Sequence, residues 1–320
     1  MHLDLFGLPN DRFEMPHSKK YFLTSRRNFL KTTAGLAGAA ALSSWVSCDE
    51  VEKNKIPLYA HLWVYASRYP PDWNCTPILN EVFSDLQYAG FEGVELMEIL
   101  LKQDGAVARF KELTDQYSLP VIGTSYYADM WNKNKQQEIL EDVELVTERL
   151  HAVGGSLLGI TVGDAKHVKT EDELDAQAEL LKKILVVCKK NKIEPNLHNH
   201  TFEVVNNMHD LNGTLKRVPG IKLGPDLNWL IRGGVNPAWF INTYKDQIVF
   251  MHIRDQDANG KWTEAVGEGV TDFKAIAQAL KNINYKGKAA IELAFDKPPV
   301  NPLKEDWKKS REYVKKVFEW

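Results

Sequence analysis

The sequence predicts a single (β/α)8 barrel behind an export signal. The chain has 320 residues, of which 44% are hydrophobic and 26% are charged, and both fractions are typical of a folded globular protein. From residue 56 onward, short apolar runs rich in β-branched residues alternate with longer amphipathic segments, which indicates parallel β/α construction. Eight such pairs lie between residues 56 and 320, and a barrel of this kind typically has about 250 residues.

The first 47 residues have the features of an export signal. Arg26 and Arg27 precede an apolar run rich in Gly and Ala, which extends from residue 32 to residue 46. The run is too short for a transmembrane helix, which needs about 20 apolar residues. We therefore expect a twin-arginine-type signal over residues 1–47; a buried first helix would be the competing interpretation.

This leader predicts export to the periplasm. Residues 48–55 form the expected linker, and the barrel is expected over residues 56–320. Cys48 is a candidate lipid-attachment site, although Trp45 departs from the small aliphatic residue usual three positions before such a cysteine. The sequence leaves lipidation, and assembly into a homo-oligomer, open.

The charge balance argues against nucleic acid as a partner. The chain has 40 basic and 43 acidic residues, a net charge of −3, and removal of residues 1–47 leaves 34 basic and 40 acidic residues. The exported part is therefore acidic, which disfavours a polyanion. Three cysteines are too few for a disulfide framework.

The elements follow one another as strand and helix along the chain. The expected strands cover residues 58–64, 93–97, 120–125, 156–162, 193–198, 221–226, 248–253 and 289–293. The expected helices cover residues 76–89, 106–117, 136–153, 171–191, 208–217, 237–244, 273–282 and 304–318. The rival fold, a doubly wound open sheet, normally has a Gly-rich loop after its first strand, whereas residues 66–71 contain no glycine.

Polar residues at the strand ends predict a metal site. His198, Asp226, His252 and Glu292 stand at or near the ends of the last four expected strands, with spacings of 28, 26 and 40 residues. The C-terminal ends of barrel strands meet at one mouth, so each strand would contribute one ligand. Imidazole and carboxylate groups suit one divalent ion, such as Zn, Mn, Co or Mg. Each residue taken alone could equally be a structural strand-end group.

Further side chains are expected at the same mouth. His200 lies two residues after His198 on the same side of the strand, so one can bind metal and the other substrate. Arg254 can donate to a substrate oxygen, or pair at the surface with Asp255 or Asp257. Aromatic side chains near strand ends could pack against a sugar or belong to the core; they are Trp63, Tyr126, Tyr127, Trp131 and Trp229.

Together these segments give the chain a resemblance to a known superfamily. It resembles the xylose isomerase-like TIM barrels, the sugar phosphate isomerase/epimerase group that includes ketose 3-epimerases, inosose dehydratases and endonuclease IV. The resemblance covers residues 56–319 and is carried by segments 90–96, 198–203, 226–229, 233–237, 252–255, 267–273 and 291–292. These motifs are specific for the superfamily and not for one reaction.

The resemblance implies residue roles. Single-metal members take ligands from strands five to eight, which correspond to His198, Asp226, His252 and Glu292. Epimerases have glutamate at the first of these positions, so His198 argues against a symmetrical pair of carboxylates that would move a proton on both faces of a carbon. The expected catalytic residues are Glu292, His200 and His198, and the expected substrate-binding residues are Glu95, His61, Arg254, Trp229, Glu203 and Glu268.

The implied function is metal-dependent enolisation of a keto-sugar or polyol ketone. A cation beside the carbonyl stabilises the enediolate, and His200 or Glu292 takes the α-proton. Isomerisation or epimerisation follows if the proton is returned, and elimination or hydration follows in a 3-keto-glycoside lyase/hydratase or an inosose dehydratase-type enzyme. The superfamily also admits DNA repair of the endonuclease IV kind, and a barrel that binds sugar without catalysis.

Overall fold

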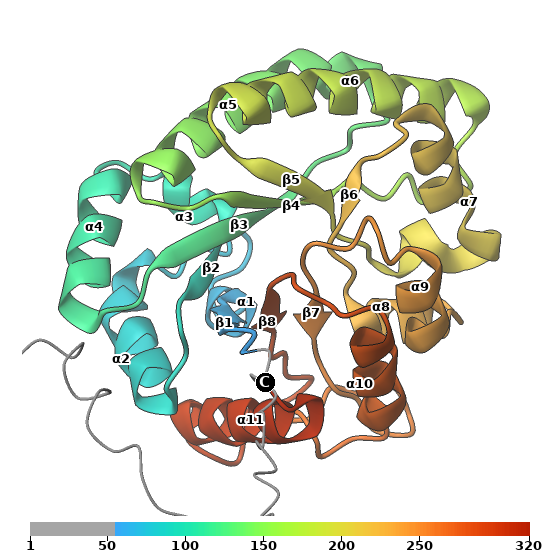
Figure 1. Cartoon of the computed structure of the whole chain (residues 1–320). Helices are drawn as coiled ribbons and strands as arrows, with labels where there is room; N and C mark the ends of the chain where they lie inside the picture. The colour runs from blue at the N-terminus through green and yellow to red at the C-terminus, as the bar shows by residue number, and fades with distance from the viewer. Residues whose placement is uncertain (1–54) are drawn as a thin grey trace, which may run out of the picture. The chain divides into compact units, whose positions relative to one another are not determined.

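The computed structural model describes residues 55–320, which fold into a ring of eight parallel strands enclosed by helices (Figure 1). The expected signal over residues 1–47 and nearly all of the expected linker lie outside the described residues. The strands are β1 (Leu58–His61), β2 (Val94–Met97), β3 (Val121–Tyr127), β4 (Leu157–Thr161), β5 (Glu194–Leu197), β6 (Lys222–Leu223), β7 (His252–Ile253) and β8 (Ala289–Ile291).

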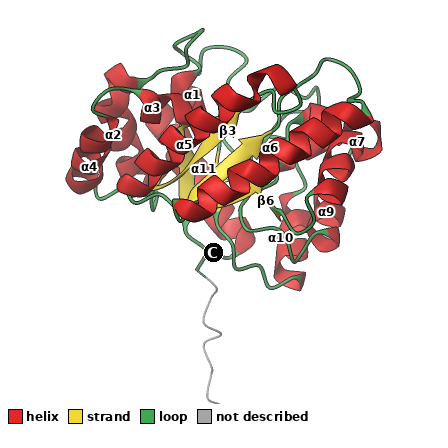
Figure 2. Cartoon of the chain, turned by 90° about the horizontal axis from the view of Figure 1, so that it is seen from above, coloured by secondary structure: helices red, strands yellow, loops and turns green. Residues whose placement is uncertain are grey.

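Helices follow the strands and pack against their outer side, as Figure 2 shows from a second direction. The α-helices are α1 (Trp63–Ala66), α2 (Leu79–Ala89), α3 (Glu98–Lys102), α4 (Ala106–Tyr117), α5 (Gln136–Ala152), α6 (Glu171–Lys190), α7 (Thr201–Arg217), α8 (Leu227–Arg232), α9 (Pro237–Thr243), α10 (Phe273–Asn282) and α11 (Leu303–Phe318). Two 3-10 turns, η1 (Thr76–Ile78) and η2 (Lys133–Lys135), precede α2 and α5.

The strand order confirms the predicted barrel. Neighbours in the sheet run β6-β5-β4-β3-β2-β1-β8-β7, all parallel. Isolated parallel bridges pair Leu223 with Ile248 and Asp226 with His252, and these bridges join β6 to the β7 side and close the ring. We call this β6–β7 junction the seam. Three backbone hydrogen bonds of 2.9 Å cross it, from the N–H groups of Leu223, Val249 and His252.

Side chains inside the ring form an apolar floor beneath a polar layer. A separate buried cluster contains Tyr59, Ile122, Leu157, Phe250 and Ala290, whereas the main core packs the strands against the helices. Residues two apart on a strand face the same side. His61, His252 and Glu292 therefore stand directly above Tyr59, Phe250 and Ala290, at the C-terminal ends of their strands.

The structure corrects several predicted boundaries. The first strand ends at His61 rather than residue 64, because α1 begins at Trp63. The helix predicted over residues 208–217 begins at Thr201, although residues 205–208 depart from helical geometry. The short helices α1, α3 and α8 were not expected, because four to six residues are too few to show a helical repeat of apolar positions.

Candidate functional site

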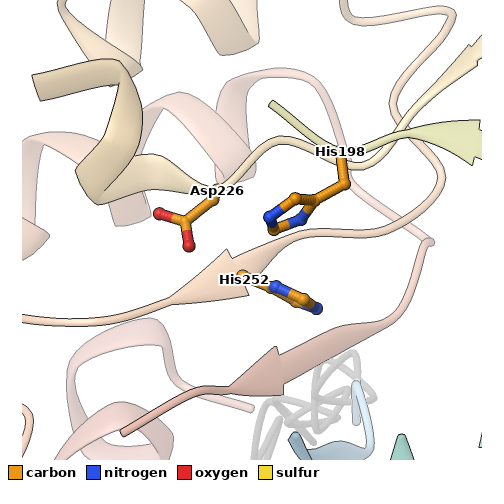
Figure 3. A group of neighbouring side chains, drawn as sticks. All are labelled: His198, Asp226 and His252. Atoms are coloured by element: carbon orange, nitrogen blue, oxygen red, sulfur yellow. The ribbon is translucent and has the colours of Figure 1, made fainter. Parts of the chain in front are cut away.

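Three of the four predicted metal ligands converge at the C-terminal ends of neighbouring strands. His198 follows β5, Asp226 follows β6 and His252 begins β7. One ligand atom from each lies within 4.8 Å of the others, and all three residues are buried. Figure 3 shows the three side chains next to one another.

Local structure fixes the direction of the Asp226 carboxylate. Asp226 is the N-cap of α8, and its Oδ1 accepts hydrogen bonds from the backbone N–H groups of Asn228 and Trp229, at 2.9 and 3.0 Å. An N-cap aspartate commonly satisfies these otherwise unpaired donors. The other oxygen, Oδ2, is therefore left for the cluster.

His252 is held between two carboxylates. Its Nε2 lies 2.6 Å from Glu95 Oε2, and its Nδ1 lies 2.8 Å from Glu292 Oε2. Glu95 thus contacts an imidazole rather than the cavity, and this is a correction to its predicted contact with substrate. Metal-binding histidines usually donate their second N–H group to such a carboxylate, which orients the ring.

Arg254 lies within the cluster rather than at the surface. Its Nε is 2.8 Å from Asp226 Oδ2, and its Nη2 pairs with Glu292 Oε1. His61 lies on the other side of Glu292, with Nδ1 3.4 Å from Oε1, and its Nε2 is 3.0 Å from Ser125 Oγ. The surface pairing with Asp255 or Asp257 is not formed: backbone N–H groups occupy both carboxylates.

Burial and charge shift the histidines in opposite directions. Burial lowers the pKa of His198 well below its usual value, so the imidazole is neutral. Burial also opposes protonation of His252, but the carboxylates of Glu95 and Glu292 outweigh it and raise the pKa to about 10. The environment around His252 therefore attracts positive charge, and a bound cation would replace the proton there.

The donor atoms fit a divalent cation. Four candidate ligand atoms are buried: His198 Nδ1, Asp226 Oδ2, His252 Nδ1 and Glu292 Oε2. Charged groups lie close to them, but none of the four makes a well-aligned hydrogen bond in the described part of the chain. Buried polar atoms in proteins are normally hydrogen-bonded. Three of the four lie 2.8 Å from a charged partner, His252 Nδ1 with Glu292 Oε2 and Asp226 Oδ2 with Arg254 Nε, whereas His198 Nδ1 has no hydrogen-bond partner among the described residues. Two imidazole nitrogens and two carboxylate oxygens are a ligand set that suits zinc, manganese or cobalt.

A cavity of about 500 Å³ opens above this cluster. The structure brings most of the residues expected at this mouth into its lining: His61, His198, His200, Trp229, Arg254, Glu292, His252 and the aromatic residues Trp63, Tyr126 and Tyr127. Asp226 lies beneath Arg254 and is fully buried.

The cavity also has residues that the sequence did not single out. Glu98, Met97, Ser125, Thr161, Trp73 and Trp262 line it. Glu98 is the first residue of α3, and burial raises its pKa above the usual value. Its position directly after the second strand was the available signal, because functional residues follow barrel strands.

Two predicted substrate contacts do not line the cavity, which corrects their expected placement. Glu203 accepts hydrogen bonds from the backbone N–H groups of His200 at 2.6 Å and Val162 at 3.2 Å, so one oxygen caps the start of α7 and the other ties it to the end of β4. Glu268 pairs with Lys309 and accepts from the N–H of Ala265. Both glutamates therefore support loops and helix ends.

A family model decides the affiliation of this barrel. Residues 83–317 match the model of the xylose isomerase-like TIM barrel. The chain belongs to the xylose isomerase-like TIM-barrel family. Residues 24–43 match the model of the twin-arginine translocation pathway signal sequence, which supports the expected export by that pathway. Within residues 55–320, no helix combines the length and apolar character that crossing a membrane requires.

Curated relatives within the xylose isomerase-like family are inosose dehydratases. One from Clostridium botulinum is 21% identical over 277 residues, which cover 77% of this chain and 91% of the relative. Another from Lacticaseibacillus casei is 27% identical over 181 residues, which cover 50% of this chain and 60% of the relative. The identity is low, but the first alignment spans nearly the whole relative.

Solved structures of sugar epimerases share the xylose isomerase-like barrel. D-allulose 3-epimerase from Methylomonas sp. has a TM-score of 0.67 at 18% identity, over 82% of this chain and 98% of its own. The 3-keto-D-glucoside 4-epimerase from E. coli has a TM-score of 0.63 at 16% identity, over 82% and 100%. A sugar phosphate isomerase/epimerase from Parabacteroides distasonis has a TM-score of 0.64 at 17% identity, over 81% and 93%. At these identities the comparison shows the shared fold.

Proposed function

We propose that this protein is an exported, metal-dependent enzyme that enolises a keto-sugar or related polyol ketone. The observation that carries the proposal is the convergence of ligand atoms from His198, Asp226 and His252, with Glu292 beside His252, at the base of a cavity. The relatives are inosose dehydratases and the structural neighbours include sugar epimerases, so both groups are enzymes that act on sugars or related polyol ketones.

The proposed ligands are His198, Asp226, His252 and Glu292. A divalent cation bound by them would supply Lewis-acid polarisation of a substrate carbonyl. Arg254 donates N–H groups beside the same carboxylates, and its guanidinium lies 5.5 Å from the centroid of the Trp229 ring, which helps to orient it. It can also donate to a substrate oxygen.

His200 is the proposed proton acceptor. Its Nδ1 is 3.3 Å from the Thr161 hydroxyl, while Nε2 makes no hydrogen bond among the described residues. Burial, and then the charge of Arg254, lower the pKa of His200 to about 4, so the ring is neutral at neutral pH. Glu292 is the second candidate acceptor, but its oxygens already face His61, His252 and Arg254.

The reaction is tested by solvent exchange. Metal-loaded protein incubated in D₂O with inososes, ketoses and 3-keto-glycosides is expected to place deuterium at a carbon beside the carbonyl. The products then separate isomerisation or epimerisation from elimination or hydration. Exchange with no substrate class would contradict enolisation and favour a non-catalytic sugar-binding barrel.

The metal assignment is tested by Asp226→Asn. Asparagine can still cap α8 but lacks the charge, so bound metal and activity are expected to fall together. The matched control is Asp272→Asn, because Asp272 caps α10 in the same way, with its Oδ1 3.0 Å from the Ala275 N–H group, outside the cluster. Unchanged metal content in the purified Asp226→Asn variant would overturn the assignment.

The role of His200 is tested by His200→Gln. This change is expected to spare metal content and lower turnover at least ~100-fold, as loss of a general base typically does. The control is His167→Gln, since His167 is half-exposed and pairs with Glu173. A variant with the original turnover would reject His200 as the proton acceptor.

Periplasmic location is proposed on the signal sequence, and lipid attachment at Cys48 stays a prediction. Cell fractionation tests the periplasmic location, and recovery of the protein in the cytoplasmic fraction would contradict it.

Labelling with a radioactive fatty acid tests lipid attachment at Cys48. The Cys48→Ala variant is the control and should lose the label.

A further inference from the structure

The cavity lining is divided between two stretches of the chain. One half comes from the ends of β5 to β8 and holds the candidate ligands and proton acceptors, His198, His200, His252, Arg254 and Glu292. The other half comes from the C-terminal parts of β2 and β3 and from the segments that follow β1 and β2, and it holds Trp63, Trp73, Met97, Glu98, Ser125, Tyr126 and Tyr127. We call the second group the aromatic half. None of the residues of the aromatic half is a candidate ligand. His61, which lies between the two halves, contacts Glu292.

The aromatic half contains a pair of tryptophans and a free carboxylate. The rings of Trp63 and Trp73 have centroids 5.4 Å apart and are tilted by 50°. Trp73 is 37% exposed, so its ring is open to the cavity mouth. Glu98 makes no ion pair within residues 55–320, because the cation one helical turn away, Lys102, pairs with Asp142 at 2.6 Å.

These groups suit a neutral sugar ring. Aromatic faces pack against the apolar C–H surface of a pyranose, and a carboxylate accepts hydrogen bonds from its hydroxyl groups. Among the described residues of the lining, Arg254 is the only lysine or arginine, and both of its ion pairs are with Asp226 and Glu292. A phosphate would therefore meet an unpaired carboxylate and no free cation.

The cavity has room for more than one sugar ring. Cavities of about 300–1,000 Å³ take drug-sized ligands, and a single hexose, with about twelve non-hydrogen atoms, is well below that size. A single ring placed over the ligand cluster would leave the aromatic half empty. The cavity volume of about 500 Å³ has room for both.

We propose that the aromatic half is a second sugar subsite, so that the substrate is an unphosphorylated glycoside whose second ring packs on Trp63 and Trp73 and hydrogen-bonds to Glu98. The proposal rests on the proposed function for the placement of the reacting ring. It narrows the substrate class from keto-sugars in general to glycosides of at least two rings.

The test is a comparison of binding by isothermal titration calorimetry with unreactive probes. The full folded protein, loaded with metal, is titrated with glucose, cellobiose, maltose, trehalose and glucose 6-phosphate. At least one disaccharide is expected to bind ten-fold or more tightly than glucose, and glucose 6-phosphate no more tightly than glucose. Equal affinity for glucose and all three disaccharides, or tighter binding of the phosphate, would overturn the proposal.

Two variants locate the second ring. Trp73→Ala is expected to remove the disaccharide advantage and to leave glucose affinity within two-fold, and Glu98→Gln to weaken disaccharide binding several-fold. The control is Trp239→Ala, because Trp239 is exposed on α9 and does not line the cavity. Equal weakening of glucose and disaccharide by Trp73→Ala would contradict a separate subsite.

Failure of the second-subsite proposal can be distinguished from failure of the proposed enolisation. Solvent exchange reports enolisation, whereas these titrations report only binding. A disaccharide preference without deuterium exchange would reject enolisation and keep the subsite. Exchange into monosaccharides without any disaccharide preference would keep enolisation and reject the subsite.

Discussion

Glu95 influences the site through His252. Its Oε2 is 2.6 Å from the imidazole Nε2, and both side chains are almost fully buried. A carboxylate in this place selects the tautomer whose Nδ1 carries a free lone pair. We therefore propose that Glu95, which was expected to contact substrate, positions the candidate ligand His252.

We predict that Glu95→Gln weakens metal binding without removing a ligand. Loss of such an outer partner typically costs about 10- to 100-fold in metal affinity. Competition with a chelating dye measures the affinity. The control is Glu98→Gln, which changes a carboxylate on the cavity wall that makes no contact with the four candidate ligands. Equal metal affinity in the two variants would contradict the role of Glu95.

Arg254 supplies positive charge to the same carboxylates that would hold a metal. With Arg254→Met, Asp226 and Glu292 lose their buried partner, and such a loss commonly costs about 3–5 kcal/mol of stability. A divalent cation can replace the lost charge. We therefore expect metal to raise the melting temperature of Arg254→Met more than that of the wild type. Calorimetry with and without a chelator measures both melting temperatures. An equal rise in the two proteins would indicate that Arg254 and the metal act independently.

The sequence predicted which residues meet at the mouth but could not assign every contact. His198, Asp226, His252 and Glu292 could be identified because parallel strand ends meet at one mouth, and that inference needs only the order of the strands. The role of Glu203 depends on which backbone N–H groups lie nearby, and Trp262 reaches the cavity through a loop that pairs Gln256 with Trp262. Loop conformation of this kind leaves no periodic pattern in the sequence.

At the scale of elements, a buried ion pair ties the loop after β4 to α7. Lys169 Nζ lies 2.6 Å from Asp210 Oδ2 and 2.7 Å from Gln177 Oε1, and Gln177 also donates to Thr214. The pair sits next to residues 205–208, where α7 departs from helical geometry. These contacts tie the part of α7 that follows the kink to the loop after β4 and to α6.

We predict that Lys169→Met lowers the free energy of unfolding by about 3–5 kcal/mol, because Asp210 is left buried and uncompensated. The double variant Lys169→Met, Asp210→Leu is expected to recover much of that loss. Urea unfolding measures both. Lys166→Met is the control, since Lys166 is exposed and its pairing with Asp164 is solvated; a comparable loss in the control would indicate that the buried pair has no special weight.

Element type was predictable where the pattern was long. The helices α4 and α10 begin and end at the predicted residues, because each shows a clear apolar face over at least ten residues. β6 and β7 contain only two residues each, although six were expected in both. Their flanking residues still pair across the seam as isolated bridges, so the apolar pattern recorded burial rather than regular strand geometry.

At the scale of the whole barrel, the seam is where a metal would have its largest effect. Asp226 and His252 are bridge partners from its two sides and are also two of the candidate ligands. A cation held by both would add a link to a junction that has few backbone hydrogen bonds.

We predict that metal slows amide hydrogen exchange at the seam more than elsewhere. Local opening there has to break the added link, so residues 222–226 and 248–253 are expected to gain the most protection. The internal control is the β3–β4 pairing, which has five register pairs and no candidate ligand. Equal protection at both places, measured by mass spectrometry, would contradict a link across the seam.

The division of the cavity has a consequence for how this protein could change over evolutionary time. The aromatic half is encoded within residues 63–127, and the ligand cluster within residues 198–292. Recombination between related genes near residue 150 would therefore exchange the aromatic half and keep the ligand cluster, as long as the incoming segment also supplies the partners that Glu95 and His61 give to His252 and Glu292. A lineage could acquire a new glycoside in this way while inheriting its reaction unchanged.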